Sequence, residues 1–97
     1  MRRGTTPTLT ISTDISLVEA SNFYLTFKQG DRVAFEKTLE DVTITDTSVI
    51  CELDQNDTLA LNDGLVRFQI RATLGDSKVA SNIMTANADE ILKGGAI

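Results

Sequence analysis

Residues 65–74 read LVRFQIRATL, and this stretch decides the fold. Apolar residues occupy every even-numbered position from 66 to 74, and Arg, Gln, Arg and Thr occupy the odd-numbered positions between them. A period of two places successive side chains on opposite faces, as in a β-strand with one face on the core and the other in water. We therefore expect a strand here with an apolar inner face.

The same period extends along most of the chain. Gly and Asp residues at positions 30–31, 46 and 75–76 interrupt this alternation and indicate turns. The remaining strands are predicted over residues 7–13, 22–28, 33–35, 42–44, 49–53 and 79–83, with Val33 on the apolar face of its strand and Ile83 on that of the last. About seven short strands joined by tight turns predict an all-β protein, an immunoglobulin-like antiparallel β-sandwich, with a small barrel as the competing architecture.

Three segments break the alternation. Asp54 is a candidate N-cap for one short helical turn within residues 54–62, which would cross between the sheets. Residues 14–21 fit either a strand or a loop with a helical turn. Asn87 followed by Glu90 resembles a capping box and predicts a helical turn that Gly94 ends.

Length and composition favour one domain. A chain of 97 residues with 41% hydrophobic and 24% charged residues is typical of a small globular protein. Residues 1–97 are expected to form a single β-sandwich domain, with 1–6 and 94–97 as flexible tails. The single cysteine, Cys51, excludes an intramolecular disulfide, so the fold must depend on packing.

The charge distribution limits the partners. The formal charge is −5, and residues 40–63 hold seven acidic residues and no Lys or Arg. This segment is either a solvated face or an interaction surface for a basic partner. Because the chain has no basic stripe, nucleic acid is not an expected partner. No apolar run approaches the roughly 20 residues that span a bilayer, so we expect no membrane contact and folding in the cytoplasm.

Catalytic and metal-binding patterns are missing. The chain has no histidine, which removes the usual general base and the commonest zinc ligand. Cys51 alternates with apolar residues and is interpreted as an inert core thiol. The acidic pairs at 40–41 and 89–90 lie in turn or capping contexts, and the calcium-loop pattern that starts at Asp54 has Leu59 and Leu65 where glycine and glutamate are required. We expect no catalytic, cofactor-binding or metal-binding residue and no enzymatic activity.

A candidate interaction surface remains. Tyr24 is the one aromatic residue in an outward phase, and Arg67, Gln69 and Arg71 share the outward face of the strand over 65–74. Tyr and Arg are enriched in protein interfaces. The alternative interpretation is an ordinary solvated strand face.

Six short segments, in order and spread over nearly the whole chain, resemble a family of small proteins encoded among the structural genes of phages and prophages of Gram-positive bacteria. The segments are RRGTTPT (2–8), FEK (35–37), LDQNDTL (53–59), RFQIR (67–71), SNI (81–83) and ILKGGAI (91–97). The family is similar to the N-terminal sandwich domain of phage baseplate upper proteins.

This resemblance implies a structural or assembly protein of the tail or baseplate. Such a protein would be made in the host cytoplasm, would contact other phage structural proteins or further copies of itself, and would be assembled into a phage particle. A host-surface or carbohydrate-binding module is the alternative function, although sugar-stacking Trp residues are missing.

Overall fold

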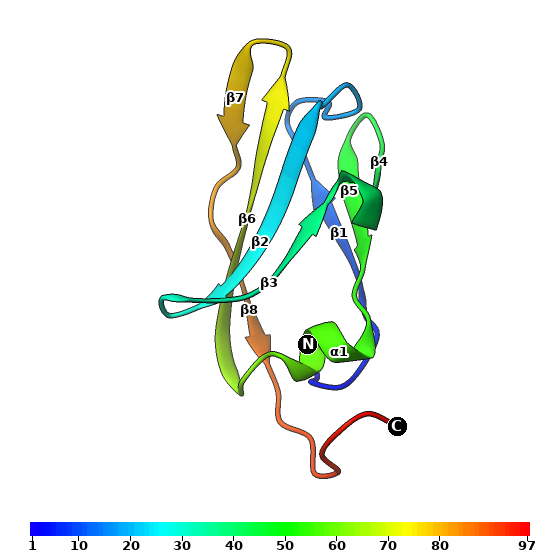
Figure 1. Ribbon diagram of the computed structural model, residues 1–97, viewed down its shortest axis with the longest axis vertical. Helices are drawn as coiled ribbons and strands as arrows, with labels where there is room; N and C mark the ends of the chain where they lie inside the picture. Colours follow the sequence, from blue (N-terminus) through cyan, green and yellow to red (C-terminus); the bar gives the residue numbers. More distant parts are fainter.

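The alternating stretch forms the centre of the larger of two sheets. In the computed structural model, which describes residues 1–97, β6 (Gly64–Leu74) pairs antiparallel with β2 (Asn22–Gln29) along one edge. Its other edge pairs with β7 (Ser77–Ala80) and then β8 (Met84–Ala88). β3 (Arg32–Thr38) pairs with β2 and completes the order β3-β2-β6-β7, which we name the larger sheet (Figure 1).

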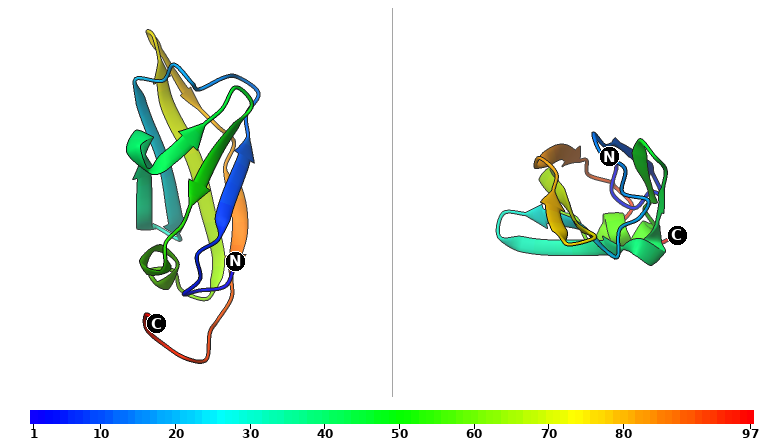
Figure 2. Two further views of the ribbon diagram at one scale, coloured as in Figure 1. Left: turned by 90° about the vertical axis from the view of Figure 1, so that its right-hand side faces the viewer. Right: turned by 90° about the horizontal axis from the view of Figure 1, so that it is seen from above.

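The smaller sheet has the order β1-β5-β4 and is also antiparallel. It consists of β1 (Thr8–Ser12), β4 (Val42–Ile44) and β5 (Ser48–Glu52). The two sheets lie on opposite sides of one interior, as Figure 2 shows from the side and from above. The expectation of an all-β protein with two antiparallel sheets is thus confirmed.

One apolar cluster of 14 buried residues joins the two sheets. The larger sheet contributes the even-numbered residues of β6 from 66 to 72 together with Phe23, Leu25 and Phe27, and the smaller sheet contributes Ile11, Val49 and Cys51. The Phe27 ring stacks on Phe35 and on Phe68, with ring centroids 4.3 and 5.3 Å apart. The period of two therefore identified the inner face of β6 and β2 correctly.

The predicted helical turn is α1 (Gln55–Leu59), which connects β5 of the smaller sheet to β6 of the larger sheet. The Asp57 backbone N–H donates to Asp54 Oδ1 at 2.7 Å, and the Asp54 backbone N–H donates to Asp57 Oδ2 at 2.9 Å. These reciprocal bonds form a capping box, so the two carboxylates in the incomplete calcium-loop pattern bind backbone donors.

A second capping box begins the 3-10 helix η1 (Leu39–Asp41), which the sequence analysis did not predict. The backbone N–H of Thr38 donates to the Asp41 carboxylate at 2.9 Å and lowers the pKa of Asp41. One carboxylate of the acidic pair at 40–41 is therefore a helix cap.

The expected last strand over 79–83 is wrong in its extent. β7 ends at Ala80, because the backbone N–H of Ile70 donates to the Ser81 hydroxyl at 3.0 Å in place of a ladder partner. Ile83 is 57% exposed instead of inward. The chain then resumes as β8, an eighth strand that pairs with the first half of β6.

The predicted C-terminal helical turn is also wrong. Asn87 lies inside β8 and opposite Leu65, so it cannot act as an N-cap, and no helix follows Glu90. Pairing with β6 prevails over the local capping pattern, since a strand partner is available at that edge.

The structure corrects the placement of Val33 and decides the conformation of residues 14–21. Val33 is 53% exposed, because a register shift after Phe27 places Val33 opposite Lys28 instead of in phase with the apolar face. Residues 14–21 form bends and a turn between β1 and β2, and they contribute the buried Leu17 to the core.

The first six residues, expected as a flexible tail, make specific contacts in the structure. The Arg3 backbone N–H donates to the Asp89 carbonyl at 3.0 Å, and the Asp89 N–H donates to the Met1 carbonyl at 2.8 Å, which places this segment parallel to the end of β8. The Thr58 hydroxyl of α1 donates to the Thr5 carbonyl at 2.8 Å. Residues 94–97 are exposed, and the Ile97 backbone N–H donates to Gln55 Oε1 at 3.2 Å.

Candidate functional site

The candidate site is the outer face of the larger sheet. In the register of β2 and β6, Tyr24 lies opposite Arg71 and Thr26 opposite Gln69. Directly opposite residues on one face of an antiparallel pair have Cβ atoms about 4.5–5.5 Å apart. The structure therefore brings the four predicted surface residues, Tyr24, Arg67, Gln69 and Arg71, onto one face.

Two further cations join them. Lys28 lies opposite Arg67, and Lys78 of β7 lies opposite Thr73, which has the same phase as Arg71. Sequence reasoning did not assign these lysines to the site, because only the strand register places them beside the arginines. The outward phase of Lys28 in the strand over 22–28 was the one signal that could have been used.

We name this surface the basic face and define it by Tyr24, Lys28, Arg67, Arg71 and Lys78. Glu36, which lies opposite Thr26, is the one carboxylate on the larger sheet's outer face, and it accepts a hydrogen bond from the Thr26 hydroxyl at 2.7 Å. Four of the nine Lys and Arg residues of an acidic chain thus gather on one sheet face.

The cations of the basic face have no carboxylate partner. The two ion pairs in the structure join Lys37 to Asp57 and the N-terminal amine to Asp89. Arg67 donates to the Gly30 carbonyl at 3.0 Å, whereas the exposed Arg71 side chain makes no hydrogen bond within the chain. No ion pair within the chain therefore neutralises these four cations.

The polar side chains of the larger sheet's outer face are not equally free to contact a partner. The Gln69 amide donates to the Ser81 carbonyl at 2.8 Å and so helps to hold the interruption between β7 and β8. Tyr24 is 45% exposed and borders a shallow hollow of about 240 Å³. Tyr24 and Arg71 are the two predicted residues that are free to contact a partner, while Gln69 also has a structural role.

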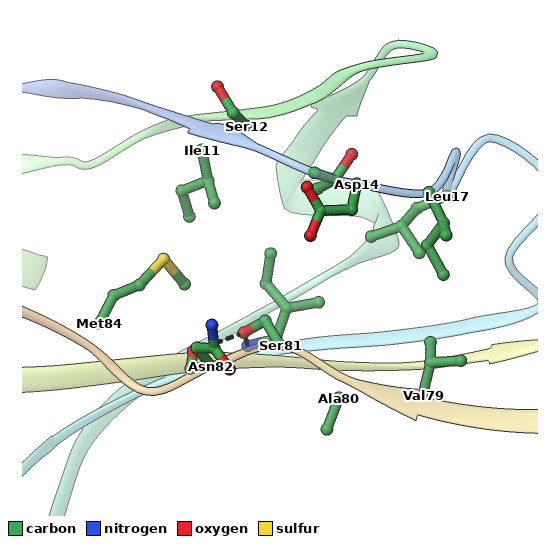
Figure 3. A pocket seen from close by; sticks show the side chains of 12 residues that line it. Ile11, Ser12, Asp14, Leu17, Val79, Ala80, Ser81, Asn82 and Met84 are labelled. Carbon is green, nitrogen blue, oxygen red and sulfur yellow. Dashed lines mark hydrogen bonds between the residues drawn. The ribbon is translucent and has the colours of Figure 1, made fainter.

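A second concave surface lies at the open side of the sandwich, between β1 and the β7–β8 segment. It is a groove of about 520 Å³. Figure 3 shows Ile11 and Leu17 facing Val79, Ser81 and Met84 across it. Asp14 is the one ionisable residue among the twelve that line it, so the groove has no pair of acidic and basic groups for proton transfer.

Cys51 is fully buried in the core, and burial raises the pKa of its thiol. The thiolate is the reactive species, so this cysteine is unsuited to nucleophilic chemistry. No group of three or more His, Cys, Asp or Glu side chains is placed to hold a metal ion, and neither helical segment is long and apolar enough to span a membrane.

We predict that the native protein reacts with a thiol reagent such as DTNB at least about 100-fold more slowly than the unfolded protein, because access to Cys51 requires opening of the core. Stopped-flow absorbance with and without denaturant measures the two rates. Rapid stoichiometric labelling of the native protein would show that Cys51 is accessible and would contradict this placement.

Comparison with family models, with curated proteins and with solved structures finds no match to this chain. The functional inference therefore depends on the geometry of the basic face and on the sequence resemblance described above.

Proposed function

We propose that this chain is a non-enzymatic structural or assembly protein of a phage or prophage, associated with the tail or baseplate, and that it acts through protein-protein contacts of the basic face. The six segments that resemble phage structural proteins support the biological setting. The observation that carries the mode of action is the set of four unpaired cations around the exposed Tyr24.

The order of the strands supports an immunoglobulin-like sandwich as part of this proposal. In such folds, strands B, E and D share one sheet and strands C, F and G share the other. If β1 is taken as strand B, the orders β1-β5-β4 and β2-β6-β7 follow this arrangement, and β3 extends the second sheet. Sandwiches of this type present broad sheet faces for contacts between proteins.

The chemistry of the basic face indicates the kind of partner. Arg side chains present several fixed donors that match carboxylates, and an exposed Tyr adds rigid contact area at a small cost in conformational entropy. Because the strands are paired, the backbone positions from which these side chains project are fixed before binding. A protein surface that presents carboxylates is the expected complement.

The proposal is tested by incorporation into particles. Phage particles are induced from the strain that carries the gene, purified intact and quantified by mass spectrometry. We expect the protein in these particles, and we expect an Arg67→Glu/Arg71→Glu variant to be depleted at least about tenfold, since charge reversal turns attraction to carboxylates into repulsion.

Lys93→Glu is the matched control, because Lys93 is exposed and lies outside the basic face. It should be incorporated like the wild type, and circular dichroism of the purified variants should be unchanged. If the wild-type protein is absent from intact particles, the assembly function is wrong. If a glycan array instead shows binding that Tyr24→Ala abolishes, the carbohydrate-binding alternative replaces it.

A further inference from the structure

We propose that the partner of the basic face is a second copy of this chain, whose acidic side it contacts in a head-to-tail arrangement. This inference rests on the proposed function, because it names the partner of the same face. It follows from the separation of charge between the two sides of the sandwich.

The acidic side is formed by β4, β5 and the turns that flank them. Between Lys37 and Arg67 the chain has no Lys or Arg. Asp46 lies in the turn between β4 and β5, and Glu52 lies at the end of β5. We define the acidic side by these two residues. The outward positions of the smaller sheet add Thr8, Thr10, Ser12, Thr43, Ser48 and Ile50, and no cation.

The carboxylates of the acidic side are free to bind. Asp41 and Asp54 act as helix caps and Asp57 pairs with Lys37. In contrast, Asp46 and Glu52 are exposed and have no cation within ion-pair distance. The molecule thus has unpaired carboxylates on one side, and on the other side four unpaired cations with Glu36 as the one carboxylate among them.

The geometry prevents these charges from pairing within one copy. The basic face is the outer face of the larger sheet, and the acidic side belongs to the smaller sheet, with the buried core between them (Figure 2). A second copy can supply the missing complement. Since the two surfaces differ, the contact is heterologous, and its repetition gives an open chain or a closed ring.

The size of the molecule and the screening of its charges by salt are compatible with this contact. The Cα extents are 46 × 25 × 18 Å, so the broad face can accommodate the roughly 800 Å² per partner that a standard interface buries. The Debye length is about 8 Å at physiological ionic strength, which is shorter than the 18 Å thickness of the molecule. Charges far from the contact are therefore largely screened, and these include much of the net charge of −5.

Sedimentation equilibrium of the purified protein tests the proposal. We expect the weight-average mass to rise with protein concentration in 50 mM salt, and the association constant to fall at least about tenfold in 500 mM salt, where the Debye length shortens to roughly 4–5 Å. A protein that stays monomeric at millimolar concentration in 50 mM salt would overturn the inference.

Two variants test the head-to-tail geometry. Arg67→Gln/Arg71→Gln removes the two guanidinium charges of the basic face, and Asp46→Asn/Glu52→Gln removes both charges of the acidic side. Each variant alone should be a monomer, because each has lost one of the two surfaces. Mixed together, they should form a 1:1 dimer that grows no further, since each supplies the surface that the other lacks.

Glu19→Lys and Lys93→Glu are the controls, because both residues are exposed and lie outside the two surfaces. Both controls should associate like the wild type. A mixture of the two disrupting variants that stays monomeric would overturn the inference.

If the protein is monomeric in solution but is still incorporated into particles through the basic face, the second copy is excluded while the assembly function stands. If it self-associates but is absent from particles, the assembly function is wrong while the self-association stands.

Discussion

Phe27→Ala is expected to lower the free energy of unfolding by about 3–5 kcal/mol, the typical cost of removing a buried phenyl ring from a core. Phe27 is fully buried in β2, and its ring stacks between Phe35 of the neighbouring strand β3 and Phe68 of β6. Truncation removes both stacking contacts and leaves a cavity at the centre of the larger sheet. This single residue thus affects three adjacent strands.

The expected effect is a large share of the total stability. Small proteins unfold with about 0.05–0.15 kcal/mol per residue, so a chain of 97 residues has roughly 5–15 kcal/mol in all. Each kcal/mol lowers the melting temperature by about 4–8 °C at this size. Urea unfolding followed by circular dichroism measures the change. Ile83→Ala, at a 57% exposed position, is the control and should cost less than about 1 kcal/mol. Equal effects of the two substitutions would contradict the core assignment.

Asp57→Ala is expected to lower the free energy of unfolding by about 2–4 kcal/mol. One part is the lost capping box of α1, worth about 1 kcal/mol. The other part arises because Lys37 Nζ lies 2.6 Å from Asp57 Oδ2, with both side chains mostly buried, and an unpaired buried donor costs about 1–3 kcal/mol. Urea unfolding measures the loss. Asp63→Ala removes an exposed carboxylate without a partner and should change stability by less than about 0.5 kcal/mol.

A second variant separates the two parts. In a Lys37→Met background the ammonium group is gone, so Asp57→Ala should cost only the capping contribution. An unchanged cost in that background would mean that the ion pair contributes nothing to stability.

The same ion pair has a predictable pH dependence. Burial lowers the pKa of Lys37, but the hydrogen bond and the charge of Asp57 outweigh it, so the pKa is raised above its ordinary value of 10.5. A group with a raised pKa in the folded state stabilises the fold fully below its unfolded pKa, and this contribution is lost as the pH rises through the folded value. The stability difference between wild type and Asp57→Ala should therefore shrink above about pH 10.5, as measured by urea unfolding across the alkaline range. A difference that is constant with pH would contradict the charged pairing.

Much of the fold was predictable because its signals are local. The alternation in residues 65–74 identified the inner face of β6, and Asp54 as a candidate N-cap indicated the start of α1. Cys51 was recognised as a core residue from its apolar neighbours in the alternation. These inferences needed no knowledge of which strands pair.

The failures depend on tertiary contacts. The end of β7 depends on the bond from Ile70 to Ser81, eleven residues away in the sequence. β8 was missed because Asn87 and Glu90 also satisfy a capping pattern, which the pairing with β6 overrides. Val33 was assigned to the wrong face because the register shift after Phe27 has no signature in the sequence. The contacts of residues 1–3 with Asp89 join segments near the two ends of the chain and have no local signal.

The candidate site was predicted in part. Tyr24, Arg67, Gln69 and Arg71 were assigned to outward faces from their phase alone. Lys28 and Lys78 were not included, because two strands must be aligned before their side chains can be placed next to Arg67 and Thr73. Likewise, the lack of carboxylate partners for these cations could be established only once the positions of all carboxylates were known.

The central claim is that the basic face contacts carboxylates of a partner in the assembled particle. Zero-length carbodiimide cross-linking of purified particles tests it most directly, because this reagent joins a lysine amine to a carboxylate in direct contact. We predict cross-linked peptides through Lys28 or Lys78, and none through Lys93, which is exposed like Lys78 but lies outside the face. Cross-links that involve Lys93 while both Lys28 and Lys78 remain unmodified would contradict the account.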